Sequence, residues 1–184
     1  KSDTVYDLMT ATDRKFYAPN HPYQDSPIPL PGTRQTISAP HVHAYALEEF
    51  VEHHKSTNGP LNVLDVGCGS GYLTGCLARW VQPTGGHVYG IDIYENLVNL
   101  TRNNLHNDDP NLLNSITLQT ANGWEGLPET APFHAIHVGA AAAEFPLELA
   151  RQITDNGIMI VPIGPDQGSQ GLYKAERRSN SKDD

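Results

Sequence analysis

A glycine-rich segment holds the residues whose types and spacing most clearly allow chemistry. Residues 63–74 read V-L-D-V-G-C-G-S-G-Y-L-T, so an apolar run ends in Asp65, and Gly67, Gly69 and Gly71 follow at alternate positions. Glycines at this spacing let a backbone turn sharply and approach a ligand closely. An apolar run, a glycine loop and a helical pattern in this order predict the first strand, turn and helix of a nucleotide-binding α/β unit.

The glycine spacing and the acid indicate the kind of nucleotide. Dinucleotide-binding loops follow G-x-G-x-x-G, and Tyr72 stands at the position of the third glycine in that pattern. A carboxylate at the strand end, such as Asp65, repels a pyrophosphate and attracts a cation. S-adenosyl-L-methionine (SAM) carries an ammonium and a sulfonium group and no phosphate. The segment therefore predicts a SAM site, and the chain a methyltransferase.

Two further polar positions follow predicted strands and fit the same cofactor. Asp92 follows the second strand, where an acid would bind the ribose hydroxyls. Asn122 and Gly123 follow the third strand, where an amide would meet the adenine amine. Ligands of open α/β sheets bind outside the carboxyl ends of the strands. Each residue alone is also typical of a turn, but the agreement of all the positions favours the SAM site.

Apolar periodicity predicts the elements that would position these residues. Strands and helices alternate after residue 60, which is typical of an α/β fold. We expect a doubly wound, mostly parallel sheet with helices on both faces, as in Rossmann-like class I SAM-dependent methyltransferases. The expected strands are Leu61–Val66, His87–Ile91, Ile116–Gln119, Phe133–Val138, Gly157–Ile163 and Leu172–Arg177. The expected helices are Gly71–Val81, Tyr94–Leu105 and Pro146–Ile153.

The first third of the sequence has a different pattern. Helical spacing covers residues 3–12, a proline-rich stretch at 17–40 predicts a long ordered loop, and helical spacing resumes until Asn58. We expect one methyltransferase domain over residues 1–184. Its parts are an N-terminal helix, loop and cofactor-flanking helix (1–58), a Rossmann-like core (61–177) and a polar tail (178–184).

The composition of the chain indicates which kinds of binding partner are not expected. A net charge of −9 with scattered Lys and Arg disfavours nucleic-acid binding. No apolar run approaches the roughly 20 residues of a membrane span, and no basic-then-apolar leader begins the sequence. We therefore expect a cytoplasmic protein that binds no membrane, and a monomer. Cys68 and Cys76 suit reduced thiols, and the paired histidines lack the neighbours of a metal site, so no metal is expected.

Two further stretches resemble signatures of one family. Residues 36–44 (T-I-S-A-P-H-V-H-A) and 135–142 (A-I-H-V-G-A-A-A) are similar to signatures of the protein-L-isoaspartate (D-aspartate) O-methyltransferases. The resemblance covers nearly the whole chain and is greatest for the eukaryotic branch. It implies SAM-dependent methyl transfer to the carboxylate of L-isoaspartyl and D-aspartyl residues in damaged proteins and peptides, which initiates their repair.

The resemblance also implies roles for residues at matching positions. Ser38 would hold the acceptor carboxylate and act in catalysis, and His137, Val138 and Gly139 would lie beneath the peptide substrate. The implied cofactor contacts are Thr36, Ile37, Ser38, His43, Asp65, Gly67, Gly69, Gly71, Asp92, Ile93, Asn122 and Gly123. Without the resemblance, a serine two residues before a proline, as Ser38 is before Pro40, is typical of a helix N-cap.

The sequence departs from the family pattern in three places. Asn122 replaces the usual aspartate, which leaves an acceptor without charge assistance. Trp124 replaces a usual arginine or lysine. The resemblance also begins inside the family's N-terminal helical region and lacks its C-terminal closing strand. On this comparison we expect residues 172–177 to form an unpaired edge, and the chain to be less stable and weakly active.

Methyl transfer to a carboxylate needs no general base. A carboxylate with a pKa of about 4 is ionised at neutral pH and is already the nucleophile. Alignment of the two groups can then supply about 7–11 kcal/mol of barrier reduction. Two alternatives stay open: a SAM-dependent enzyme with a different acceptor, and a SAM- or peptide-binding homologue with reduced or lost catalysis.

Overall fold

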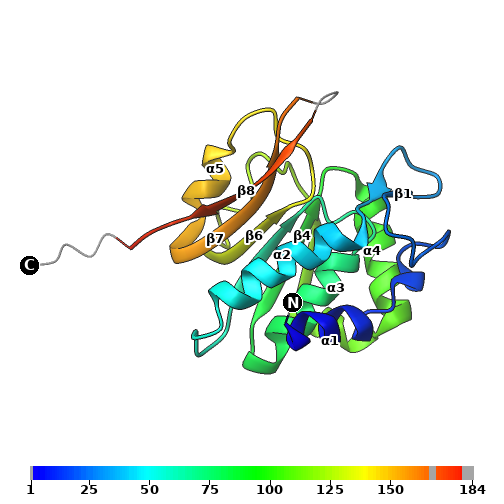
Figure 1. Cartoon of the computed structure of the whole chain (residues 1–184), viewed down its shortest axis with the longest axis horizontal. Coiled ribbons are helices and arrows are strands. Elements are labelled where there is room, and N and C mark those ends of the chain that lie inside the picture. Colours follow the sequence, from blue (N-terminus) through cyan, green and yellow to red (C-terminus); the bar gives the residue numbers. More distant parts are fainter. Residues whose placement is uncertain (1, 166–168, 180–184) are drawn as a thin grey trace, which may run out of the picture.

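The centre of the molecule is a six-stranded sheet with the strand order β5-β4-β3-β6-β7-β8 (Figure 1). The computed structural model describes residues 2–165 and 169–179. Neighbouring strands are parallel except β7 and β8, which are antiparallel. The strands are β3 (Asn62–Val66), β4 (His87–Asp92), β5 (Ile116–Thr120), β6 (Phe133–Val138), β7 (Ile153–Ile163) and β8 (Gly171–Glu176). This mostly parallel sheet confirms the predicted α/β fold class.

Helices cover both faces of the sheet, but unequally. Four helices contribute buried side chains to one apolar cluster, and Figure 1 shows α1, α2 and α3 packed together on that side. They are α1 (Asp3–Ala11), α2 (Pro40–His53), α3 (Tyr72–Val81) and α4 (Glu95–Asp108). The opposite face is covered by the short α5 (Leu147–Arg151) and by residues of the segment 121–131. The 3-10 helices η1 (Arg14–Phe16), η2 (Gln82–Thr84) and η3 (Pro110–Ser115) lie in the connections.

Strand β3 shows why both faces must be covered. Its side chains alternate, so Val63 belongs to the apolar cluster on the helix-rich face and Leu64 to the cluster on the other face. Both are fully buried, and burial of one such side chain contributes roughly 1.5–3 kcal/mol. A parallel strand buried on both faces reads as a continuous apolar run, which is the pattern that predicted this strand.

The proline-rich stretch 17–40 contains a short hairpin that the sequence analysis missed. Strand β1 (Ile28–Pro29) pairs antiparallel with β2 (Thr36–Ile37). Between them Gly32 has φ +72°, the left-handed region that glycine adopts without strain. The expected loop is therefore partly wrong, and the adjacent Pro31 and Gly32 were the available turn signal. The hairpin fixes the T-I-S segment directly before α2.

The start of β7 also differs from the prediction. A helix was expected at 146–153 and a strand from Gly157, but α5 is shorter and β7 begins at Ile153. The register between β6 and β7 shifts between Phe133 and Ala135, which marks a bulge in the pairing. A bulge inserts unpaired residues and breaks the alternation of side chains. The first part of β7 therefore lacks the period-2 pattern that identifies strands.

The predicted last strand is present and paired on one side. Strand β8 pairs with β7 from Gly171 to Glu176, and the Arg177 N–H just beyond it donates to the Gly157 carbonyl at 3.0 Å. Of the predicted polar tail at 178–184, residues 180–184 lie outside the described residues.

His54, at the C-cap of α2, should make the fold sensitive to acid. Burial lowers the pKa of His54 to about 4, and its Nε2–H donates to the His134 carbonyl at 3.0 Å. A histidine in the unfolded chain titrates near pH 6.5. Between about pH 6.5 and 4 the unfolded chain therefore binds more protons, so the stability supplied by neutral His54 falls as the pH falls through this range.

The variant His54→Gln should lose less stability on acidification, because an amide can donate to the His134 carbonyl without titrating. Urea unfolding at a series of pH values measures this, with the exposed His21→Gln as the matched control. Equal acid sensitivity in the wild type and His54→Gln would contradict the assignment.

Candidate active site

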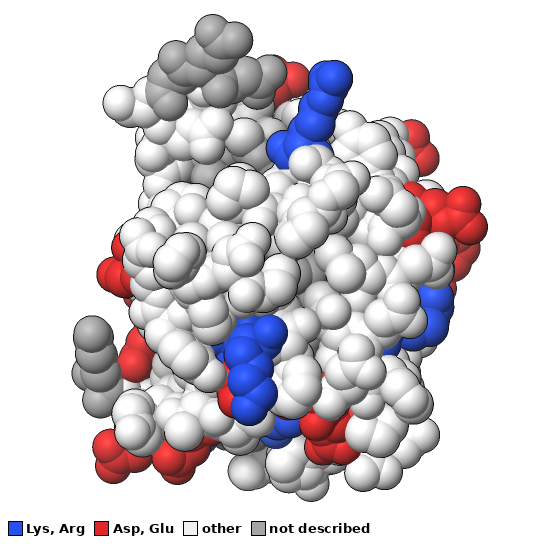
Figure 2. Space-filling model, turned by 90° about the vertical axis from the view of Figure 1, so that its right-hand side faces the viewer, with Lys and Arg blue, Asp and Glu red and all other residues white. Residues whose placement is uncertain are grey.

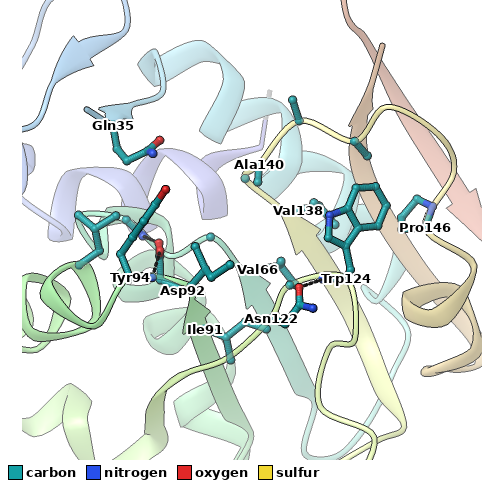
Figure 3. Close-up of a pocket in the computed structure, with 18 of the residues that line it drawn as sticks. Gln35, Val66, Ile91, Asp92, Tyr94, Asn122, Trp124, Val138, Ala140 and Pro146 are labelled. Atoms are coloured by element: carbon teal, nitrogen blue, oxygen red, sulfur yellow. Dashed lines mark hydrogen bonds between the residues drawn. The ribbon is translucent and has the colours of Figure 1, made fainter. Parts of the chain in front are cut away.

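A cavity of about 260 Å³ lies at the carboxyl ends of the parallel strands, where β3, β4 and β6 deliver their last residues. A smaller space of about 40 Å³ adjoins it on the side of α2 and α3. The two share Thr36, Gly67, Gly69 and Gly139 among their lining residues, so they form one site with two compartments. Figure 3 shows the larger compartment.

The structure brings nearly all the candidate site residues together. The larger compartment is lined by Asp92, Ile93, Asn122, Gly123 and Val138, and the smaller one by Ile37, Ser38, His43, Asp65 and His137. The shared residues Thr36, Gly67, Gly69 and Gly139 are also among the candidates.

Gly71 is the one candidate that lines neither compartment. It is the N-cap of α3 with φ +86°, and a Cβ at this position would lie 2.7 Å from the Thr101 methyl carbon. The glycine is therefore required for the close approach of α4 to the loop, and its place in the sequence pattern reflects packing.

Asp92 ends β4 at the floor of the larger compartment and is 7% exposed. Its Oδ2 accepts the Gly69 N–H at 3.1 Å and its Oδ1 accepts the Tyr94 N–H at 3.1 Å (Figure 3). Burial raises the pKa of the Asp92 carboxyl above its ordinary value, and these N–H groups oppose that rise. Because each carboxylate oxygen has two acceptor sites, Asp92 can still accept from hydroxyl groups of a ligand.

Asn122 is held in a turn at the edge of the same compartment. Its side-chain oxygen accepts the Trp124 N–H at 3.1 Å, and its Nδ2 donates to Glu125 at 2.8 Å. Trp124 is 49% exposed. In Figure 3 its indole flanks the compartment beside Val138, on the side opposite Gln35 and Tyr94. Sequence reasoning did not include Trp124, Tyr94 or Gln35 among the site residues.

Asp65 is almost completely buried, at 1% exposed, and both its oxygens have partners within the protein. Oδ1 lies 2.8 Å from His137 Nδ1, and Oδ2 accepts the Thr74 hydroxyl at 2.6 Å. The carboxylate thus joins β3 to β6 and α3. It orients His137 in the smaller compartment, a role that the position of the acid at a strand end did not suggest.

Cys68 lies in the glycine loop, buried, with its thiol 3.5 Å from the Thr101 hydroxyl. Burial raises the pKa of the Cys68 thiol to about 12 and that of the buried Cys76 thiol to about 11. Both cysteines are free.

Ser38 lines the smaller compartment and does not cap α2. The N-cap of that helix is Ala39, with no side-chain hydrogen bond, so the capping alternative for Ser38 is wrong. The Ser38 carbonyl accepts a 2.6 Å hydrogen bond from Arg14 Nη2, and Arg14 Nη1 lies 3.2 Å from His43 Nδ1. No spacing rule identified Arg14, which is 24 residues away from Ser38 in sequence.

The lining of the site suits a nucleoside that carries no phosphate. Among the described residues, no Lys or Arg lines either compartment. Apolar side chains, including Ile91, Leu97 and Leu149, line the larger compartment together with the buried Asp92 carboxylate. A flat apolar base with a hydroxylated sugar fits such a lining, whereas a pyrophosphate would meet a carboxylate without a cation.

Comparisons with known proteins agree with this geometry. A family model for protein-L-isoaspartate(D-aspartate) O-methyltransferase (PCMT) matches residues 1–183. The protein-L-isoaspartate O-methyltransferase of Caenorhabditis elegans is 38% identical over 178 residues, covering 96% of this chain and 77% of the relative. That of Triticum aestivum is 40% identical over 169 residues, covering 89% of this chain and 71% of the relative.

A solved structure is similar over its whole fold. It is the crystal structure of a beta-aspartate methyltransferase (PCMT) from Plasmodium falciparum in complex with S-adenosyl-L-homocysteine. The TM-score is 0.86 with 34% sequence identity, and the match covers 97% of this chain and 84% of that chain.

Proposed function

We infer the function of this chain from its family, because the chain belongs to the protein-L-isoaspartate(D-aspartate) O-methyltransferase family. It is an enzyme that uses SAM to methylate the carboxylate of isoaspartyl residues in damaged proteins, which initiates their repair. The observation that carries this conclusion is the family match over residues 1–183, together with a phosphate-free nucleoside site at the strand ends.

We propose specific roles for the residues around the cofactor. Asp92 accepts from the ribose hydroxyls, and Asn122 and Gly123 contact the adenine. The support is that Asp92 is a buried acceptor with free lone pairs and lines the same compartment as Asn122. The remaining proposed cofactor contacts are Thr36, Ile37, Ser38, His43, Asp65, Gly67, Gly69 and Ile93, with the Asp65 carboxylate acting through His137.

The chemistry requires alignment more than proton transfer. Bound SAM supplies a methyl group on a positively charged sulfur. The acceptor carboxylate, with an ordinary pKa of about 4, reaches the site ionised, so no residue of the chain must remove a proton. We propose that His137, Val138 and Gly139 lie beneath the peptide, and that the Ser38 hydroxyl and backbone N–H groups beyond Gly139 orient its carboxylate and replace its water. The Gly139 N–H itself donates to the Val66 carbonyl at 2.7 Å. Holding two reactants in line is worth about 7–11 kcal/mol.

Methyl transfer from labelled SAM to an isoaspartyl peptide, beside the same peptide with a normal aspartyl residue, tests the function. Methylation of the isoaspartyl peptide alone is expected. Methylation of neither peptide, with labelling of another acceptor, would favour the alternative of a different substrate. SAM binding without turnover on any acceptor would favour a binding homologue.

The variant Ser38→Ala should lower turnover by about 10–100-fold, the effect of losing one hydrogen bond to a charged group. The melting temperature should change little, because Ser38 does not cap α2. Ser26→Ala, in the same loop but outside the site, is the matched control. A lower melting temperature with unchanged specific activity would assign Ser38 a structural role instead.

We propose that the enzyme works as a cytoplasmic monomer that binds no nucleic acid and no membrane. The net charge of −9 disfavours nucleic-acid binding, as does the face in Figure 2, on which Lys and Arg are scattered and do not form a patch. Within the described residues, no helix has the length and apolar character needed to cross a membrane. Light scattering after gel filtration tests the monomer.

We also propose that residues 1–184 act as one domain. Val5 of α1, Leu47 of α2 and Leu77 of α3 belong to the same apolar cluster as Val63 of β3. The N-terminal helices therefore share their packing with the Rossmann-like core, which supports a single folding unit.

A further inference from the structure

Arg14 is a buried cation whose position suggests a role in the site. It is 4% exposed, and no ion pair joins it to a carboxylate among the described residues. Its Nη2 donates to the Ser38 carbonyl at 2.6 Å, and its Nη1 lies 3.2 Å from His43 Nδ1. The guanidinium stands 4.9 Å above the Tyr72 ring. Within the described parts of the chain, its Nε has no hydrogen-bond partner.

The contact with Arg14 determines where His43 carries its proton. A guanidinium has five N–H donors and no acceptor, so His43 Nδ1 must accept with its lone pair. A neutral imidazole protonated on one nitrogen then carries its N–H on Nε2. His43 is buried and lines the smaller compartment beside Ser38. The ring can therefore present a fixed donor to a ligand.

The surroundings of His43 keep it neutral. Burial lowers the pKa of His43 well below its ordinary value, and the neighbouring Arg14, His137 and His41 lower it further. The other groups that face it are the Tyr72 ring, at 5.2 Å between centroids, and, through His137, the Asp65 carboxylate. Arg14 itself faces Tyr72, Cys76 and Asp25. On this side of the smaller compartment, the positive charge is therefore carried by Arg14 and not by His43.

We propose that Arg14 is a positioning residue that fixes His43 as an Nε2–H donor and holds the Ser38 segment, so that the smaller compartment binds a carboxylate. The proposal rests on the proposed function, because that reaction brings two carboxylates to the site: the amino-acid carboxylate of SAM and the acceptor carboxylate of the peptide. Both have the chemistry that an N–H donor backed by a buried cation recognises.

The test compares Arg14→Met, Arg14→Lys and a matched control, Arg79→Met. Arg79 is a second largely buried arginine near α1, and it pairs with Asp108 at 3.1 Å and with the Thr12 hydroxyl at 3.3 Å. It lines neither compartment. Its loss should therefore reproduce the cost in stability of removing a buried arginine without affecting the binding of a carboxylate.

At neutral pH, Arg14→Met should lower kcat/KM by about 10–100-fold, the size expected for losing a hydrogen bond to a charged group. Arg14→Lys should recover part of this loss. A deficit equal to that of Arg79→Met, with no recovery in Arg14→Lys, would overturn the proposal.

The imidazole nitrogen resonances of His43 give a readout that does not depend on activity. The wild type should show the Nε2–H form from neutral pH down to about 5.5, and Arg14→Met should show a mixture of forms. An Nδ1–H form in the wild type would overturn the proposal.

Calorimetry with SAM and the peptide KM at saturating SAM identify which carboxylate is held. A loss in SAM affinity assigns the cofactor carboxylate, and a loss confined to the peptide KM assigns the acceptor. A wild type that binds SAM but methylates no isoaspartyl peptide would refute the proposed function, whereas the His43 resonances would still test Arg14.

Discussion

Replacing Asp65 with alanine should lower the free energy of unfolding by about 2–6 kcal/mol, because two polar groups each lose their hydrogen-bond partner at about 1–3 kcal/mol apiece. The Asp65 carboxylate is 1% exposed and holds His137 on β6 and Thr74 on α3. Its removal leaves the buried Thr74 hydroxyl and the His137 imidazole without their partner. Urea unfolding at pH 7 measures the change.

The variant Asp65→Asn separates charge from shape in this prediction. An amide of nearly the same size can keep one of the two contacts, so its loss of stability should lie between those of the wild type and Asp65→Ala. Asp155→Ala, at an exposed ion pair with Arg177, is the control and should change stability by no more than about 1 kcal/mol. A loss below about 1 kcal/mol for Asp65→Ala would show that the triad of Thr74, Asp65 and His137 is not a structural unit.

Replacing Asp92 with alanine should weaken SAM binding by about 1.5–3 kcal/mol, which corresponds to about 10–150-fold in Kd. Asp92 is the acid lining the larger compartment, and the Gly69 and Tyr94 N–H groups hold it in place. Its removal takes away both the ribose acceptor and the group that ties the glycine loop to the start of α4. Calorimetric titration with SAM measures the effect.

Two further variants test whether the loss of SAM affinity in Asp92→Ala is specific to the Asp92 carboxylate. Asp92→Asn keeps an acceptor but not the charge, so its affinity should fall by less. Glu95→Gln removes an exposed acid three residues later, at the first turn of α4, and should leave Kd unchanged. Unchanged SAM affinity in Asp92→Ala would show that the ribose lies elsewhere in the site.

Much of the fold could be predicted because the local sequence patterns of strands and helices match the burial of those residues in the structure. The strand at 61–66 is apolar on both faces and is followed by a glycine loop, so its place and its type follow from the sequence. The hairpin at 28–37 and the first half of β7 were missed for the opposite reason. Short strands and bulged strands do not sustain a period long enough to identify.

The residues that line the site could be predicted from the sequence, but the contacts between them could not. Asp65 was identified as an acid at a strand end, yet only the fold brings His137 and Thr74 to its two oxygens, from 72 and 9 residues away. Arg14 gave no signal from spacing, because its partners Ser38 and His43 lie on a different element. Contacts of this kind depend on how η1, α2, α3 and the sheet pack, which periodicity does not encode.

The two cysteines determine how this enzyme withstands oxidants. A thiol reacts with peroxide or alkylating agents as its thiolate, and the pKa values of about 12 and about 11 keep Cys68 and Cys76 protonated at physiological pH. Cys68 sits in the glycine loop of the cofactor site, where conversion to a sulfenic acid would add bulk and polarity. The cofactor loop of this repair enzyme therefore carries a thiol of low reactivity.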